Sequence, residues 1–223
     1  MPSWSERRKF RRYPMQLPLL HAPIAPPAPS AGVGWTRDVS EGGACVETGE
    51  RLPPGLPLRL RLLTDRGTIE AEAQVAWSGE PRGPEGGILH GLAFTQVTPD
   101  QHEALRHLLL TRAMVRPAGV RLPVQVSVTC QPRGEAGPPL QAWTSNISRG
   151  GLLLRLPQVL PPGTALEITL YTLTGLVRVE GTVAWVAPPE ARTPEAPIRH
   201  GFEFTALEWS TAHSLARFLA EAT

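Results

Sequence analysis

Four short segments recur in the same order in the two halves of the chain. Each half has an apolar segment with proline, a polar tripeptide before paired glycines, a segment ending in Val-Ala-Trp, and a segment containing His-Gly. A repeat of this kind is a tandem duplication. We therefore expect two domains of one fold, at residues 1–111 and 112–223. The matching pairs are QLPLL and RLPVQVSV (from Gln16 and Arg121), RDVSEGGACVE and SNISRGGLLLRL (Arg37 and Ser145), EAQVAWSG and EGTVAWVA (Glu72 and Glu180), and LHGLAFTQV and RHGFEFTAL (Leu89 and Arg199).

The apolar residues of each half recur at every second position over short segments. Clusters of proline and glycine, such as RLPPGLPLRL and VLPPGTALEITL, separate these segments. A period of two with such breaks is typical of short antiparallel strands. Each half is therefore predicted to be a small β-domain, with exposed hairpin connections at residues 22–34 and 131–141.

Each half ends in a segment with helical spacing. In the first, Thr98 precedes Pro99 and Gln101 completes a capping box, which is typical of a helix start. In the second, we expect Ser210 to cap the helix. The residues predicted to form the buried stripes are Ala104, Leu105, Leu108 and Leu109 in the first helix and Leu215, Phe218 and Leu219 in the second.

Composition favours a globular protein. The chain has 223 residues, a net charge of +2 and 41% hydrophobic residues, which is enough to form hydrophobic cores. Its sequence contains neither a long uncharged apolar run nor a secretory signal, so we expect a cytoplasmic protein without membrane insertion. Cys45 and Cys130 are far apart and lack partners at metal-ligand spacing, so we expect both to be buried as small hydrophobic residues.

The sequence carries no signature of the common enzyme classes. GPEGGILHG lacks the Lys and Ser or Thr of a phosphate-binding loop, and the serines beside paired glycines do not form a nucleophile elbow. His102 and His107 are five residues apart and point in different directions on a helix. We expect structural roles for His90 and His200. The chain is therefore predicted to have no catalytic residues, no metal site and no cofactor.

A dense basic cluster, RRKFRR, occupies residues 7–12. Arginine donates paired hydrogen bonds to guanine or to phosphate, and its planar face stacks on bases. Further along, Asp38 offers an acceptor for guanine N–H groups and Ser40 a hydroxyl. Gly43 permits either a positive φ or close approach of a ligand. Together these residue types indicate a site for a guanine nucleotide.

RKFRR (Arg8 to Arg12) and DVSEGG (Asp38 to Gly43) resemble the RxxxR and [D/N]xSxxG motifs of PilZ domains, bacterial receptors for cyclic di-GMP. The resemblance covers essentially the whole chain as two copies. It implies a mainly β protein with two tandem six-stranded antiparallel β-barrels, each followed by a C-terminal α-helix. It also implies a ligand site in the first domain formed by Arg7, Arg8, Arg12, Asp38, Ser40 and Gly43. Arg8 and Arg12 would clamp bases and phosphates, Asp38 would read a guanine edge, and Ser40 and Gly43 would shape the turn on the phosphate side.

The second domain keeps Asn146, Ser148 and Gly151 of the second motif. RAMVR supplies Arg112 and Arg116 at the spacing of the first motif. However, Arg116 lies one residue further from RLPV than Arg12 lies from QLPL, and Arg121 has no partner at the family's spacing. Binding by the second domain through these residues is an open expectation.

Other interpretations of these residues stay open. The basic cluster also fits a solvated tail, and Asp38 and Asn146 also fit turn capping. No basic stripe with interleaved aromatic residues follows the cluster, so we do not expect a nucleic-acid polymer as a partner. Four tryptophans recur in pairs. We expect Trp77 and Trp185 in the core or at the barrel edge. Trp35 and Trp143 precede the polar loops, and a position at the border of the site is one interpretation of them.

Two functions remain. The first is a cyclic di-GMP receptor that rearranges its arginine segment and surface on binding and signals to a protein partner, in motility, exopolysaccharide production or development as the resemblance suggests. The alternative is a ligand-independent adaptor of the same fold that acts through protein contacts of one or both barrels.

Overall fold

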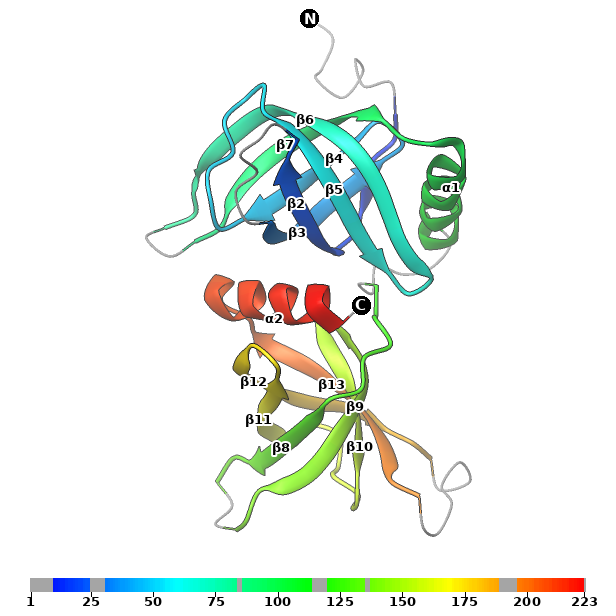
Figure 1. Cartoon of the computed structure of the whole chain (residues 1–223). Helices are drawn as coiled ribbons and strands as arrows, with labels where there is room; N and C mark the ends of the chain where they lie inside the picture. Colours follow the sequence, from blue (N-terminus) through cyan, green and yellow to red (C-terminus); the bar gives the residue numbers. More distant parts are fainter. Residues whose placement is uncertain are drawn as a thin grey trace, which may run out of the picture. The chain divides into compact units, whose positions relative to one another are not determined.

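The structure is a computed structural model of the chain. It describes residues 10–24, 31–83, 86–113, 120–134, 137–188 and 196–222, without the side chains of residues 112, 113 and 206. Two compact units divide the chain, Met1–Val120 and Arg121–Thr223. Each is described by itself below (Figure 1).

Six strands of the first unit close into an antiparallel barrel in the order β3-β2-β5-β6-β7-β4, because β4 also pairs with β3. A short strand, β1, pairs with β3 outside this ring. Helix α1 follows the barrel. The elements are β1 (Tyr13–Pro14), β2 (Pro18–Pro23), β3 (Gly32–Ser40), β4 (Gly43–Thr48), β5 (Pro57–Thr64), β6 (Gly67–Pro81), β7 (Ile88–Gln96) and α1 (Pro99–Ala113).

The second unit repeats this architecture as a closed barrel with the order β10-β13-β12-β11-β8-β9, followed by helix α2. The prediction of two mainly β domains, each a six-stranded antiparallel barrel with a closing helix, is therefore confirmed. The elements are β8 (Ser127–Pro132), β9 (Leu140–Ser148), β10 (Gly151–Leu156), β11 (Ala165–Thr172), β12 (Gly175–Val186), β13 (Ile198–Ala206) and α2 (Trp209–Ala222).

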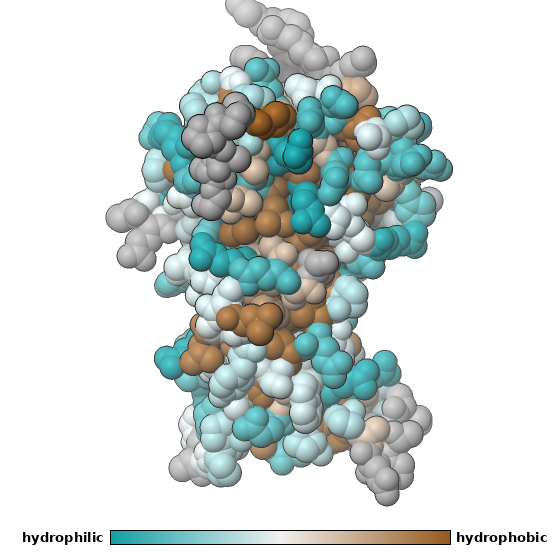
Figure 2. Space-filling model, in the orientation of Figure 1, coloured by the Kyte–Doolittle hydropathy of each residue, from teal (hydrophilic) through white to brown (hydrophobic). Residues whose placement is uncertain are grey.

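The alternating pattern of the strands places apolar side chains inside each barrel. In β5, Leu58, Leu60 and Leu62 are fully buried, whereas Arg59 and Arg61 between them are exposed. Burial of one such leucine contributes about 1.5–3 kcal/mol. On the face shown in Figure 2, hydrophilic and hydrophobic residues are interspersed.

Helix α1 begins at Pro99 as predicted, and Thr98 Oγ1 accepts a hydrogen bond from the Gln101 backbone N–H at 3.4 Å. The reciprocal half of the capping box differs from the prediction, because the Gln101 side-chain oxygen accepts instead from the backbone N–H of Glu70 in β6, at 2.9 Å. This bond ties the start of the helix to the barrel. Leu105, Leu108 and Leu109 are buried as expected, whereas Ala104 is exposed.

Helix α2 begins at Trp209, so Ser210 lies inside its first turn and the prediction that Ser210 caps the helix is wrong. The backbone N–H of Ala212 instead bonds to the carbonyl of Glu208, one residue before the helix. The predicted buried stripe of Leu215, Phe218 and Leu219 is confirmed.

Both cysteines are free and buried, as expected. Burial raises the pKa of the Cys130 thiol to about 12 and also raises that of Cys45, to which the nearby Asp38 charge contributes. Of the two described helices, neither is long and apolar enough to cross a membrane. Within the described ranges, His, Cys, Asp and Glu side chains do not gather into a group of three that could hold a metal ion.

Candidate functional site

The two motifs of the first domain meet at an ion pair. Pairing of β1 with β3 sets Pro14 opposite Asp38, so the residues just before β1 run beside the polar end of β3. There Arg12 Nη1 lies 2.7 Å from Asp38 Oδ1, and both side chains are 30% exposed. Residues separated by 26 positions in the sequence thus share one site on the barrel surface.

The segment before β1 also packs on the loop of the second motif. A Cβ built on Gly42 would lie 2.5 Å from the Phe10 ring, so only glycine leaves room for the ring here. The next residue back, Glu41, reaches the closing helix, with Oε2 at 3.6 Å from His102 Nε2 and 3.8 Å from Arg106 Nε. Direct contacts therefore run from the arginine segment through the motif loop to α1.

Ser40 and Gly43 are held by the barrel itself. The Ser40 hydroxyl is buried and donates to the Gly43 carbonyl at 3.0 Å. A Cβ on Gly43 would lie 2.1 Å from the Leu92 carbonyl of β7, and the φ of Gly43 is +158°. The close approach anticipated at Gly43 is therefore an approach of strand β7. Both residues shape the turn between β3 and β4.

Asp38 begins a row of residues that crosses four strands of the barrel. The register pairs Asp38 with Cys45, Cys45 with Gly91, and Gly91 with Trp77. Directly opposed residues share one face of a sheet, so Trp77 and Asp38 stand on the same outer surface. At about 4.8 Å per strand, their positions are about 14 Å apart.

Trp77 lies against Gly91. A Cβ on Gly91 would be 1.9 Å from Trp77 Nε1, and the same relation holds between Trp185 and Gly201, at 2.0 Å. Trp77 and Trp185 are each 45% exposed. They therefore stand on the outer surface, which excludes the core and leaves the barrel edge of the two predicted places. Sequence reasoning missed Trp77 as a neighbour of the site. The sequence could have revealed this neighbour, because Val-Ala-Trp and His-Gly recur together in both halves. The tryptophan of the first segment pairs across strands with the glycine of the second.

The entry segments of the two domains are aligned by a threonine in each. Its hydroxyl joins two backbone groups of the segment that leads into the barrel. In the first domain Thr36 donates to Met15 O at 2.6 Å and accepts from Leu17 N at 2.9 Å. In the second Thr144 donates to Val124 O at 2.7 Å and accepts from Val126 N at 3.0 Å.

This alignment makes RLPV the counterpart of RYPM, with Arg121 in the position of Arg12. Accordingly, Arg121 Nη1 donates to Asn146 Oδ1 at 3.3 Å. The position that corresponds to Arg8 is then residue 117, a proline. The sequence alone aligns RLPV with QLPL, which leaves Arg121 without a role. The structure corrects this alignment. It was based on residue identities alone, whereas the observed register is set by the hydrogen bonds of Thr36 and Thr144.

Several predicted site residues lie outside the described part of the chain. These are Arg7, which precedes the first motif, Arg8 of that motif, and Arg116 of the second domain; Arg112 is in α1, but its side chain is not described. Asn146 is placed beside Arg121 as stated above. Ser148 donates to the Gly151 carbonyl at 3.0 Å, and a Cβ on Gly151 would lie 2.1 Å from Phe202 O, so this turn repeats that of the first domain. Ligand binding by all of these residues stays a prediction.

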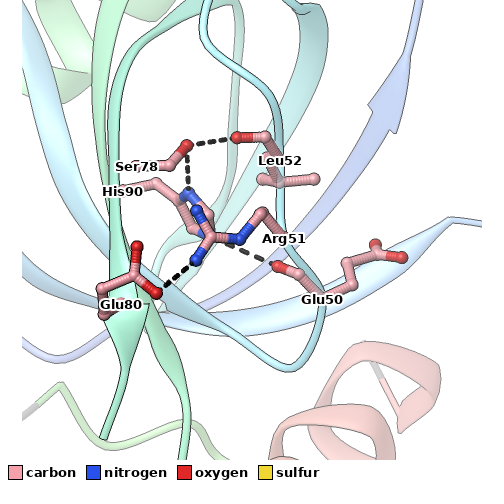
Figure 3. Close-up of polar contacts among 6 residues, drawn as sticks. All are labelled: Glu50, Arg51, Leu52, Ser78, Glu80 and His90. Carbon is pink, nitrogen blue, oxygen red and sulfur yellow. Dashed lines mark hydrogen bonds and ion pairs between the residues drawn. The ribbon is translucent and has the colours of Figure 1, made fainter.

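The two His-Gly histidines are structural, as expected, and fully buried. His90 Nε2 lies 3.2 Å from the Glu50 carbonyl and therefore carries the hydrogen. Its Nδ1 lies 3.1 Å from Ser78 Oγ, whose hydroxyl donates its one hydrogen to the Leu52 carbonyl (Figure 3). Burial lowers the pKa of His90, and the nearby charge of Arg51 lowers it further against the opposing effect of the Glu50 carbonyl.

His200 uses the other tautomer. Its Nε2 accepts from the Leu160 backbone N–H at 3.1 Å, so Nδ1 carries the hydrogen and donates to the Ile198 carbonyl at 2.9 Å. Each histidine thus ties a loop to the strand that carries the histidine: His90 joins the loop after β4 to β7, and His200 joins the loop after β10 to β13.

Two matches to one domain family cover most of the chain. The PilZ domain family matches residues 6–111 and 112–221. The Bacillus subtilis inhibitor of motility (MotI/DgrA) is 13% identical, with 93% of this chain and 96% of that chain covered and a TM-score of 0.38. The K. pneumonia MrkH–c-di-GMP complex is 16% identical over 91% and 86% of the two chains, at 0.40. YcgR in complex with c-di-GMP from Escherichia coli is 12% identical over 92% and 83%, at 0.38. The curated proteins include no match. Because the family match spans nearly the whole sequence as two copies, this chain belongs to the PilZ domain family.

Proposed function

We propose that the first domain is a receptor for cyclic di-GMP in the bacterial cytoplasm, and that it binds this ligand without chemical conversion. One observation carries the proposal. Arg12 and Asp38, which come from two distant motifs, lie 2.7 Å apart on the outer surface of the barrel, each partly exposed. A cation with paired donors beside a carboxylate acceptor suits a guanine nucleotide.

Arg12 and Asp38 would act on different parts of the ligand. The guanidinium has five N–H donors, and the contact with Asp38 involves Nη1. The remaining donors suit a phosphate or the O6 and N7 edge of guanine. Asp38 would accept from guanine N–H groups, with Arg7 and Arg8 adding further positive charge. Ser40 and Gly43 would hold the turn that positions Asp38.

The row beyond Asp38 offers a surface for a flat base. Cys45 and Gly91 are small, and the exposed Trp77 ring lies at the end of the row. Stacking of a base on an aromatic ring contributes about 1–3 kcal/mol. A ligand that spans the row would therefore combine ionic contacts at one end with stacking at the other.

The output would be a changed protein surface recognised by a protein partner. Ligand contacts at Arg12 would compete with the Asp38 ion pair and alter the packing of Phe10 on Gly42. Glu41 links this loop to α1, so the helix would respond to binding. Following the family resemblance, the regulated process would be motility, exopolysaccharide production or development.

For the second domain we propose the alternative function, an adaptor that acts through protein contacts independently of cyclic di-GMP. Its Arg121 stands in the position of Arg12, but a proline stands at the position of Arg8. The neutral Asn146 replaces the carboxylate. The second site therefore keeps one of the two arginines of the RxxxR motif. It attracts a dianionic ligand less strongly than the first site does.

Isothermal titration of cyclic di-GMP into the full chain tests the receptor proposal. We expect Arg8→Ala, Arg12→Ala and Asp38→Ala each to weaken binding about tenfold or more, since a bidentate base contact contributes about 1–3 kcal/mol. Cyclic di-AMP should bind far more weakly, because adenine lacks the edge that Asp38 reads.

Arg61→Ala is the matched control, because Arg61 forms another arginine–acid pair on the same barrel, 3.4 Å from Glu70. It should leave affinity unchanged. Absence of binding by the wild-type chain, or wild-type affinity in all three site variants, would remove the receptor function and leave the fold intact. An Asn146→Ala variant that loses a second class of sites would show that the second domain also binds.

A further inference from the structure

A hollow of about 530 Å³ opens on the outer surface of the second domain. Its volume falls within the range of small-molecule sites, about 300–1,000 Å³. The motif residues Asn146, Ser148 and Gly151 do not line it. The residues that do are Pro123, Gln125, Trp143, Thr144, Ser145, Arg155 and Pro197.

Trp143 presents its ring to this hollow. It stands in β9 between Ala142 and Thr144, which are both buried, so alternation along the strand turns Trp143 outward. Its side chain is 46% exposed. An exposed indole beside a hollow is a ready surface for stacking with a flat ring.

Arg155 lies directly opposite Trp143 in the register of β9 and β10. Opposed side chains on one face of a sheet have Cβ atoms about 4.5–5.5 Å apart. The Arg155 Nε donates to Ser145 Oγ at 2.7 Å, which fixes the plane of the guanidinium. An anchored guanidinium is a preorganised donor for phosphate.

The first domain serves as an internal comparison, because Thr36 and Thr144 align the two barrels. The residue that corresponds to Trp143 is Trp35, which is fully buried, and Arg155 is replaced by Glu47. Glu47 is 6% exposed at its side chain and lies 3.7 Å from Arg37. At this pair of positions an exposed indole therefore faces an arginine in the second barrel and not in the first.

We propose that this hollow is a binding site for a purine nucleoside monophosphate. The base stacks on Trp143, the phosphate accepts hydrogen bonds from Arg155, and the Gln125 amide pairs with a base edge. Stacking and phosphate binding are supplied by adjacent side chains, so both halves of the ligand contribute to affinity. The inference is independent of cyclic di-GMP binding by the first domain.

Isothermal titration of the full chain with GMP and with AMP tests the proposal. Ribose 5-phosphate, which has only the phosphate half, and guanosine and adenosine, which have only the base half, are titrated separately. We expect at least one mononucleotide to bind, and to bind about tenfold or more tightly than either half. Trp143→Ala and Arg155→Glu should each weaken that binding about tenfold or more, whereas Trp143→Phe, which keeps a ring, should retain most of it.

Arg178→Glu makes the same charge change at an exposed position of the same barrel outside the hollow, and it should leave affinity unchanged. Thermal unfolding of each variant checks that the fold is retained. Failure of both mononucleotides to bind, binding of a half as tight as that of the whole, or binding unchanged in Trp143→Ala and Arg155→Glu would overturn the proposal. The Arg12→Ala variant should bind the mononucleotide normally, which separates this site from the proposed receptor site.

Discussion

Arg121 donates a hydrogen bond to the Asn146 side chain at 3.3 Å, in the position where the first domain pairs Arg12 with Asp38 at 2.7 Å. The second domain thus keeps the geometry of the pair but replaces an ion pair with a bond to a neutral amide. This relationship fixes which arginine belongs to the second site, and it leads to the first prediction.

Restoring the missing arginine should create a second ligand site. Pro117→Arg places an arginine four residues before Arg121, the spacing of Arg8 and Arg12. We expect the number of cyclic di-GMP sites per chain in a titration to rise in this variant. Ala118→Arg adds the same charge out of register and should leave the number of sites unchanged. An equal effect of both substitutions would show that charge, and not register, governs binding.

Gly91→Ala should destabilise the first domain. The new Cβ would meet Trp77 Nε1 at 1.9 Å and Cδ1 at 2.5 Å, so the ring must move. Overpacking of this kind costs about 1–3 kcal/mol, and we expect a lower midpoint of thermal unfolding. Because the clash is with one side chain, the double variant Gly91→Ala/Trp77→Ala should lose less stability than the sum of the single variants. Strict additivity would contradict the contact.

Glu41→Gln should loosen the link between the motif loop and α1. The substitution removes the charge that faces His102 at 3.6 Å and Arg106 at 3.8 Å. Exposed pairs contribute about 0.2–1 kcal/mol, so stability should change little. Amide hydrogen exchange in α1 should rise, and the effect of cyclic di-GMP on that exchange should shrink. Glu70→Gln, which removes an acid paired with Arg61, is the control and should preserve the ligand effect.

Acid should destabilise the first domain through His90. Burial lowers the pKa of His90 in the folded state from 6.5, so the unfolded chain binds a proton more readily than the folded one. Stability is therefore complete above pH 6.5 and falls as the pH drops from there toward the lowered folded pKa. We expect His90→Gln to show a smaller fall in unfolding midpoint between pH 8 and pH 5 than the wild type. An equal fall would assign the acid sensitivity to other groups.

The order of strands and helices could be predicted from the sequence because it depends on local signals. Period-two segments, the Thr98-Pro99 start of α1 and the duplicated motifs each act within a few residues. The register of the entry segments could not be predicted in the same way, since it is fixed by hydrogen bonds from Thr36 and Thr144 to residues about 20 positions away. Letter matching alone aligned the wrong pair of segments.

The surroundings of the site depended on contacts that no single segment reveals. Trp77 joins the row of Asp38 only because β3, β4, β7 and β6 lie side by side. Of the two places predicted for Trp77, the core was wrong, because the glycine that accommodates its ring lies 14 positions further along the chain. The Gln101 side chain does not complete the predicted capping box for a similar reason, since it bonds to the backbone N–H of Glu70 in another element, β6.

The turn formed by Ser148 and Gly151 has a consequence for how such chains are recognised in genomes. Its serine bonds within the turn, and its glycine makes room for a neighbouring strand. Both requirements come from barrel closure, so selection for a folded domain would preserve this half of the signature in a lineage that had stopped responding to any nucleotide. The arginines, which bond on the outer surface and not within the turn, are the residues whose gain or loss would record the history of signalling.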